Sequence, residues 1–457
     1  MTRAATNPQR RAADRVAHDG PHRHIAGLDG IRAVAAGLVL LFHYWGMSGR
    51  PELPAPLSLV ATNGGVGVDL FFVISGFILF LPWARAAWTG RPVRRRRYLE
   101  NRFRRILPAF WFNMAVLVVV AQPAMLFGLD GLRDLFLYGT FLAGFAPPSV
   151  APTLMLNAVA WTLCIEVTFY LALPLIAPLF VRHRWRVALP AVLLAATVVK
   201  MGIIARYGDL ADPGVMVAAA RNLAGTMNEF ASGMAVAGLW ASLEHRRVRV
   251  PLVVGPACTV IGLIGIWAPL YVGQYVVGRE DMLHGTGPLG WIPWLTMFPL
   301  VALSAAVALF GICHTPNALT RLLSVRPIAY LGVVSYGIYL WHLPVGSWLA
   351  AGIPDGNGAV ERLLLLLTVS TAVTIGCAAF SHRFVEQPFL RSARTPVVAR
   401  PDGGAAPGPG RETAIARPHG IRGPSPRTAL LTAPLIAVPR APEQALVPSR
   451  TAPPTVG

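Results

Sequence analysis

Arg32 and His43 lie eleven positions apart in a mostly apolar stretch, residues 27–45. At about 100° per residue, this spacing brings both side chains to nearly the same face of a helix, roughly 16 Å apart along its axis. A guanidinium suits phosphate binding, and an imidazole suits proton transfer near neutral pH. Taken alone, His43 is as easily explained as a hydrogen-bonded packing residue beside Tyr44 and Trp45.

A second ionisable group favours a catalytic role for His43 over a packing role. Asp69 lies within GGVGVDLFFVISGF, surrounded by Val, Leu and Phe. A carboxylate in such surroundings is costly unless it meets a cation or a hydrogen-bond donor. His43 and Asp69 fall in adjacent antiparallel segments, so we predict that Asp69 orients His43 as a general base. For Gly65, Gly67 and Gly76 we predict close helix packing.

Two further arginines, Arg102 and Arg105, occupy positions i and i+3 of YLENRFRRILPAFW and therefore share one helix face. They lie where a basic loop enters an apolar stretch, on the same side as Arg32. Contact with lipid headgroups alone would explain such a pair. Guanidinium groups also bind phosphate well, and the cluster therefore predicts a phosphate-bearing cofactor from the cytosol.

Glu166 lies inside another apolar stretch, with Trp161 and Tyr170 close to it along the helix. Its own stretch holds no basic residue, so we predict a partner among the arginines named above. An ion pair that shapes a pocket fits Glu166 as well as a direct catalytic role does. His342, in YLGVVSYGIYLWHLPV, is expected to face the outer half of its segment, where a lone histidine is more often structural.

The composition shows what must hold these groups in place. Of the 457 residues, 54% are hydrophobic and only 13% are charged, against about 25% charge in soluble domains. Apolar windows of about 20 residues, the length that spans a bilayer, recur along the chain. We therefore predict an all-α polytopic integral membrane bundle of about ten transmembrane helices. The expected spans are 27–46, 65–84, 106–126, 158–180, 187–205, 221–241, 251–272, 292–312, 327–350 and 361–384.

The net charge of +19 follows the topology of these spans. Arginine-rich segments alternate with arginine-poor ones, as the positive-inside rule requires for a multi-pass protein of the plasma (inner) membrane with both termini in the cytoplasm. The charge therefore does not predict a nucleic-acid partner. The segment 134–145 is apolar but too short to span, and we expect it to be re-entrant or interfacial. The predicted domains are a basic disordered tail (1–24), the membrane domain (25–390) and a disordered Pro/Ala/Arg-rich tail (391–457).

Six strings occur in one order along residues 25–390, and together they resemble the acyltransferase-3 family of membrane O-acyltransferases. They are R-x10-H (Arg32, His43), G-VDLFFVISGF (Asp69, Gly76), R-x-x-R (Arg102, Arg105), W-T-x-x-x-E-x-x-F-Y (Trp161, Glu166, Tyr170), S-Y-x-I-Y-L-W-H-x-P (Tyr336, His342) and V-E-x-P (Glu386). One departure is Cys164 and Ile165 before the glutamate, where members commonly carry Ser and Val.

The resemblance implies ten core helices and acyl-CoA as a co-substrate, with no permanently bound cofactor and no metal. It implies His43 as the catalytic residue, and Arg32, Arg102 and Arg105 as ligands of the CoA phosphates. With Asp69 and Glu166 as further catalytic groups, and with His342, Tyr170 and Trp161 on the acceptor side, these residues form the expected site. The expected acceptor is a hydroxyl of a sugar, a glycan or a glycosylated natural product such as a macrolide, by analogy only.

Two other classes of protein remain open at this point. A secondary transporter would use buried Arg, His, Asp and Glu for binding and proton relay, but no inverted repeat is visible and the arginine pair lies away from the expected midplane. A non-catalytic membrane scaffold would not need buried charges at so many positions.

Overall fold

The computed structural model describes residues 25–145, 156–207, 222–278, 291–314, 317–354 and 356–391. Both expected tails, apart from Arg391, lie outside the described residues. So do most of the loops expected at 206–220 and 273–291.

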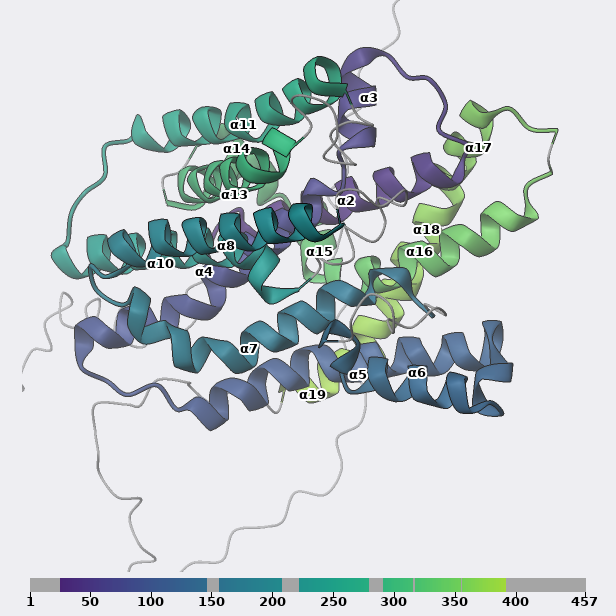
Figure 1. Ribbon diagram of the computed structural model, residues 1–457, viewed down its shortest axis with the longest axis horizontal. Coiled ribbons are helices and arrows are strands. Elements are labelled where there is room, and N and C mark those ends of the chain that lie inside the picture. Colours follow the sequence, from purple (N-terminus) through teal and green to yellow (C-terminus); the bar gives the residue numbers. More distant parts are fainter. Residues whose placement is uncertain are drawn as a thin grey trace, which may run out of the picture. The chain divides into compact units, whose positions relative to one another are not determined.

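Long helices make up the described chain, as the all-α prediction requires (Figure 1). The α-helices of the described chain, long and short, are in chain order α2 (Leu28–Met47), α3 (Ala55–Thr62), α4 (Val66–Thr89), α5 (Arg95–Ala121), α6 (Leu129–Gly139), α7 (Trp161–Phe180), α8 (Trp185–Tyr207), α10 (Leu223–Arg246), α11 (Val254–Val272), α13 (Trp291–His314), α14 (Ala318–Leu323), α15 (Arg326–Val333), α16 (Ser335–Gly352), α17 (Ala359–Leu365), α18 (Thr371–Phe380) and α19 (Gln387–Arg391).

Eight helical segments of the described chain are long and apolar enough to cross a membrane, and the bent pair α15–α16 makes up to nine. The last of them runs from Ala359 to Leu390 through two π-helical stretches, η5 (Leu366–Ser370) and η6 (Ser381–Glu386). Helix α10 occupies the sixth expected span, 221–241, but is not among the apolar segments. The chain is therefore a polytopic helical membrane protein.

The short apolar segment at 134–145 does not span. It contributes the C-terminal half of α6 and the 3₁₀ turn η2 (Leu142–Phe145). Eleven helical residues rise only about 16 Å, half of a hydrocarbon core. The indole Nε1 of Trp111 in α5 donates a hydrogen bond to Gly139 O at 3.1 Å, which holds the end of α6 against α5.

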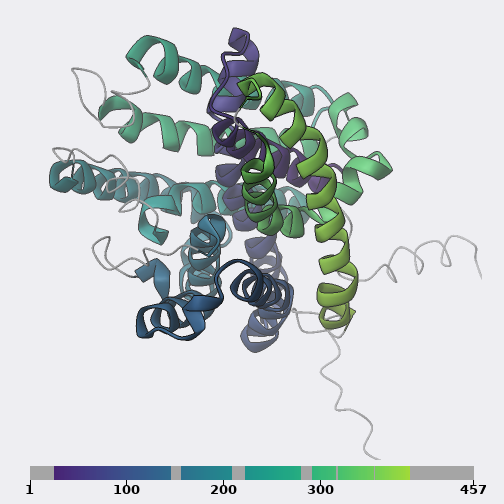
Figure 2. The same ribbon diagram turned by 90° about the vertical axis from the view of Figure 1, so that its right-hand side faces the viewer.

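Helices α2 and α4 each pack against several other helices, and α2 lies near the middle of the bundle (Figure 2). Gly76 of α4 and Gly233 of α10 let these two helices meet backbone to backbone, because a Cβ on either would collide with a carbonyl oxygen of the other helix. Gly67 approaches α2 in the same way, whereas Gly65 has open space around it. The packing prediction therefore holds for Gly67 and Gly76 only.

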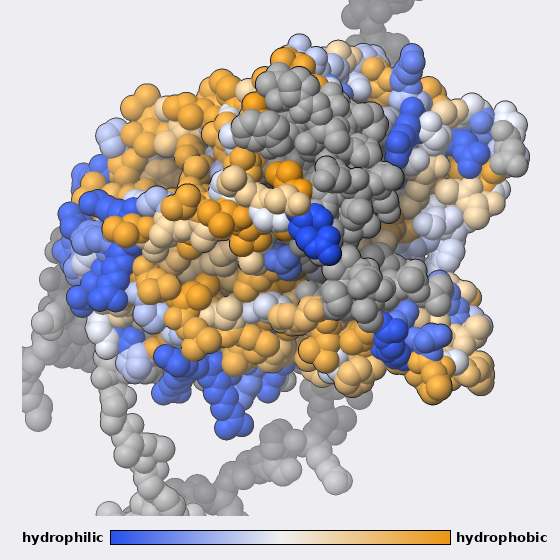
Figure 3. All heavy atoms as spheres, viewed as in Figure 1, coloured by the Kyte–Doolittle hydropathy of each residue, from blue (hydrophilic) through white to orange (hydrophobic). Residues whose placement is uncertain are grey.

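Peripheral helices expose apolar side chains, as a lipid-facing surface does. In α11, the side chains of Val260, Ile261 and Ile264 are more than half exposed. A broad hydrophobic surface covers the middle of the face shown in Figure 3, with hydrophilic atoms gathered toward its edges.

Candidate active site

Two neighbouring cavities lie among the central helices. The larger encloses about 430 Å³ and contains Asp69, Lys200 and Glu229; we call it the acidic cavity. The smaller encloses about 360 Å³ and contains the predicted arginines; we call it the arginine cavity. Val68, Phe72 and Tyr339 line both, so the two cavities share a wall.

The arginine cavity brings Arg32 of α2 together with Arg102 and Arg105 of α5. Arg32 lies 3.9 Å from Asp29, a loose contact one helical turn away. Arg102 and Arg105 form no hydrogen bond or ion pair within the described part of the chain, and Arg102 Nε is buried without an acceptor. Buried guanidinium donors that lack an anion are poised to bind one.

Helix α16 begins at this cavity because of the 72° bend that separates it from α15. Its first residue, Ser335, lines the cavity and is fully buried, and Ser335 Oγ has no hydrogen-bond partner among the described residues. The positive end of the helix dipole therefore faces the same space as the arginines, and both favour a negatively charged ligand.

Glu166 does not pair with an arginine in the described structure. Its Oε1 accepts hydrogen bonds from Ser75 Oγ at 3.0 Å and from Tyr170 OH at 2.8 Å. Arg32 lies within electrostatic reach of the carboxylate but not in ion-pair contact. The predicted Glu166–arginine ion pair is therefore wrong, because α7 turns Glu166 toward hydroxyl donors of α4 and of its own next turn. This leaves the arginines available to a ligand.

His43 and His342 form a ring-to-ring hydrogen bond between α2 and α16, with Nδ1 of His43 and Nε2 of His342 3.1 Å apart. Nδ1 of His342 lies 2.8 Å from Tyr339 O and 3.2 Å from Ile338 O. Carbonyl oxygens only accept, so Nδ1 of neutral His342 carries the proton and Nε2 is an acceptor. Nδ1 of His43 must then be the donor, which also suits Val39 O at 3.0 Å. The neutral His43 ring therefore carries its lone pair on Nε2.

Asp69 does not orient His43. Both residues line the acidic cavity, but the described hydrogen bonds to the His43 ring come from Val39 and His342. Asp69 instead lies within electrostatic reach of Lys200 in α8. The predicted His43–Asp69 contact is thus replaced by a His43–His342 contact, since the bend before α16 carries His342 inward.

The comparison with known sequences decides the family. A family profile described as "Acyltransferase domain", that of the acyltransferase-3 proteins, matches residues 25–382. The chain belongs to the acyltransferase-3 family.

Two relatives of this acyltransferase-3 chain carry names that refer to glycans. It is similar to the peptidoglycan O-acetyltransferase OatA of Listeria monocytogenes, at 26% identity over 398 residues that cover 81% of this chain and 56% of that protein. It is also similar to the exopolysaccharide production protein ExoZ of Rhizobium meliloti, at 30% identity over 335 residues covering 73% and 92%. The chain thus spans little more than half the length of the peptidoglycan enzyme. No solved structure matches it.

The three residues predicted on the acceptor side do not share one cavity. Tyr170 lines the arginine cavity and Trp161 the acidic one. His342 lines neither and reaches the site through His43.

Sequence reasoning missed two buried charges, Lys200 and Glu229, which are 3% and 2% exposed. Each lies in a predicted span, where the insertion cost that singled out Asp69 applies equally. A search for every charged residue within the predicted spans would therefore have identified Lys200 and Glu229 as candidate functional residues.

Proposed function

We propose that this protein is a membrane O-acyltransferase that moves an acetyl or other short acyl group from acyl-CoA to a hydroxyl of a sugar or glycan. The observation that carries the proposal is that Arg32, Arg102 and Arg105 converge in a cavity whose wall is shared with the cavity of His43. A phosphate-rich donor suits the first cavity, and a hydroxyl acceptor beside an imidazole suits the second.

In the proposed reaction, CoA phosphates bind the guanidinium groups of Arg102 and Arg105, and the thioester reaches toward the shared wall. Nε2 of His43 takes the proton of the acceptor hydroxyl as the hydroxyl oxygen attacks the thioester carbonyl carbon. The carbon–sulfur bond then breaks, and the imidazolium returns the proton to the departing CoA thiolate. In a covalent variant, His43 Nε2 attacks the thioester carbonyl carbon, the carbon–sulfur bond breaks and CoA leaves as a thiolate. The acceptor hydroxyl oxygen then attacks the acyl carbon, the carbon–nitrogen bond breaks, and the hydroxyl proton goes to the thiolate.

The proposed orientation places the arginine cavity toward the cytosol, where acyl-CoA is made. It rests on the basic residues that follow α4 and α7 and on the positive-inside rule. The acidic cavity then faces away from the cytosol, and the host membrane is the plasma membrane.

The test is thiol release from acetyl-, propionyl- and isovaleryl-CoA by membranes that contain the wild type, His43→Ala or a control variant. Acceptors are a panel of bacterial glycans and glycosylated macrolides, with mass spectrometry of the products. His245→Ala is the matched control, because His245 stacks on Trp88 and lines neither cavity.

We expect acyl transfer by the wild type and by His245→Ala, and a loss of about 10²–10⁴-fold in His43→Ala, the range of general base catalysis. Arg105→Gln should raise the KM for acyl-CoA while leaving the acceptor KM unchanged. Equal thiol release by His43→Ala and wild type, with both proteins folded, would overturn the proposal. A donor other than CoA would be revealed by transfer that continues without acyl-CoA.

A further inference from the structure

Three ionisable residues of the acidic cavity, the buried Lys200 and Glu229 and the half-buried Asp69, have no part in the proposed transfer step. Asp69, Lys200 and Glu229 come from α4, α8 and α10. Asn228 connects two of them, since it accepts a hydrogen bond from Lys200 Nζ at 3.4 Å and donates one to Glu229 Oε1 at 3.1 Å. Charged groups in such a site are costly unless something compensates each of them.

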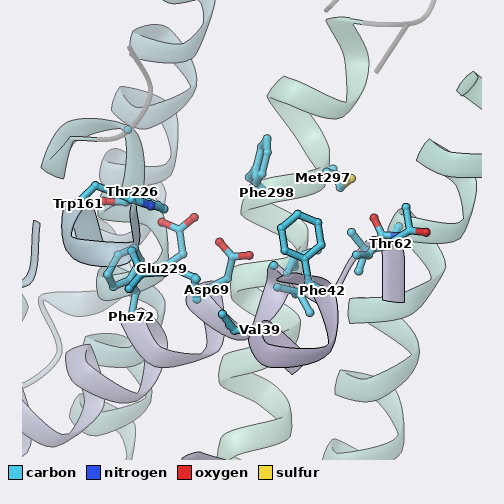
Figure 4. A pocket seen from close by; sticks show the side chains of 18 of the residues that line it. Val39, Phe42, Thr62, Asp69, Phe72, Trp161, Thr226, Glu229, Met297 and Phe298 are labelled. Carbon is cyan, nitrogen blue, oxygen red and sulfur yellow. The ribbon is translucent and has the colours of Figure 1, made fainter. Parts of the chain in front are cut away.

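Glu229 is only partly compensated. Its second carboxylate oxygen, Oε2, is buried and has no hydrogen-bond partner in the described chain. Figure 4 shows the carboxylates of Glu229 and Asp69 side by side, facing the same space inside the cavity. A ligand hydroxyl that enters this space would supply the missing donor.

The charge balance selects what can enter. Two carboxylates face one ammonium group, and Lys200 Nζ is directed to Asn228 and to the ring of Phe298, whose centroid is 4.6 Å away. Among the described residues that line it, the cavity therefore has no further cation that could bind an anionic ligand, which disfavours such a ligand.

Aromatic rings supply a second kind of surface. Phe42, Phe72, Trp161 and Phe298 line the cavity around the two carboxylates (Figure 4). Ring faces pack well against apolar C–H surfaces, while the carboxylates bind hydroxyl groups. The volume of about 430 Å³ lies within the range of about 300–1,000 Å³ typical of small-ligand sites.

We propose that the acidic cavity is a binding site for an uncharged hexose unit, with Glu229 and Asp69 accepting hydrogen bonds from its hydroxyl groups and the aromatic rings packing on its C–H face. As an acceptor site this rests on the proposed transferase function, because the sugar would lie beside His43. Binding itself is measurable without turnover.

The experiment uses saturation-transfer NMR on the full chain held in amphipol, since maltoside detergents carry competing sugar headgroups. The probes are the methyl glycosides of glucose, galactose and mannose, with methyl glucuronide as the anionic counterpart. We expect at least one neutral glycoside to bind and the glucuronide not to.

Glu229→Gln should weaken glycoside binding about tenfold to hundredfold, because it replaces one carboxyl oxygen acceptor by an amide nitrogen that only donates. The substitution keeps the side-chain size and shape, so we expect the variant to fold. The matched control is Glu244→Gln on the same helix, whose carboxylate bonds Arg85 at 2.7 Å and lines neither cavity. It should bind like the wild type.

Three results would overturn the site: no neutral glycoside binds the wild type, glucuronide binds it as well as glucoside, or folded Glu229→Gln binds like the wild type. If Glu229→Gln does not fold, the comparison of glucoside with glucuronide on the wild type decides alone. If the protein transfers acyl groups but glycoside binding does not depend on Glu229, the sugar-site proposal fails and the transferase proposal stands. If glycoside binding depends on Glu229 but thiol release does not depend on His43, the transferase proposal fails and the sugar-site proposal stands.

Discussion

At the scale of single residues, the His43–His342 contact determines which nitrogen can act as a base. His342 is held by two backbone carbonyls one turn back on its own helix, and this fixes its Nε2 as an acceptor. His43 Nδ1–H then donates to His342, and in the proposed reaction the base nitrogen of His43 is Nε2. We therefore propose His342 as a positioning residue, which acts through His43 instead of touching the substrate.

Replacing His342 should therefore affect turnover more than donor binding. We expect His342→Ala to lower kcat about tenfold to hundredfold, the effect of losing one hydrogen bond that holds the base, with the KM for acyl-CoA unchanged. His342→Gln should recover part of the loss, because its amide oxygen can accept a hydrogen bond from His43 Nδ1–H. Steady-state kinetics on purified protein measures both values. Identical losses in the Ala and Gln variants would contradict this positioning role.

At the scale of helices, the α4–α10 contact sets the distance between Asp69 and Glu229. Gly76 and Gly233 allow the two backbones to meet, so the carboxylates on these helices face one cavity. Any side chain at Gly76 would collide with the Phe230 carbonyl, one residue from Glu229.

Gly76→Ala should destabilise the protein by about 1–3 kcal/mol, the usual penalty for overpacking. The matched control is Gly37→Ala on α2, where nothing lies within 4 Å of an added Cβ and where alanine favours the helix. The midpoint of heat-induced loss of the monodisperse size-exclusion peak compares the two. A midpoint that falls equally in both variants would show that the close α4–α10 contact is not the cause.

At the scale of the whole molecule, the arrangement of basic residues predicts how the bundle lies in the membrane. Arg91 and Arg94 lie between α4 and α5 and Arg95–Arg97 form the first turn of α5, whereas the connection after α2 is poorer in arginine. The positive-inside rule places the first group in the cytoplasm, and with it the arginine cavity.

Single cysteines introduced into a cysteine-free background test this orientation. Both Arg91 and Glu52 are exposed, which makes them suitable positions. We expect a membrane-impermeant maleimide to label Glu52→Cys in intact cells, and to label Arg91→Cys only after the cells are permeabilised. The opposite labelling pattern would show that the bundle has the inverted orientation, with the arginine cavity on the side of the membrane that lacks acyl-CoA.

The sequence by itself determined the membrane class, the positions of the long helices and most of the charged residues that line the two cavities. Apolar length and the cost of a buried charge are local properties of the chain, so Asp69, Glu166 and the arginines stand out without any structure. The short segment at 134–145 was excluded as a span by its length alone.

Only the tertiary structure decided which of these groups meet. The rotation of each helix about its axis depends on packing, such as the glycine contacts of α4, and on the bend before α16. These features give His43 the partner His342 in place of Asp69, and give Glu166 the partners Ser75 and Tyr170 in place of an arginine. Pairing across helices is non-local, and spacing along one helix cannot specify the face that a neighbouring helix presents.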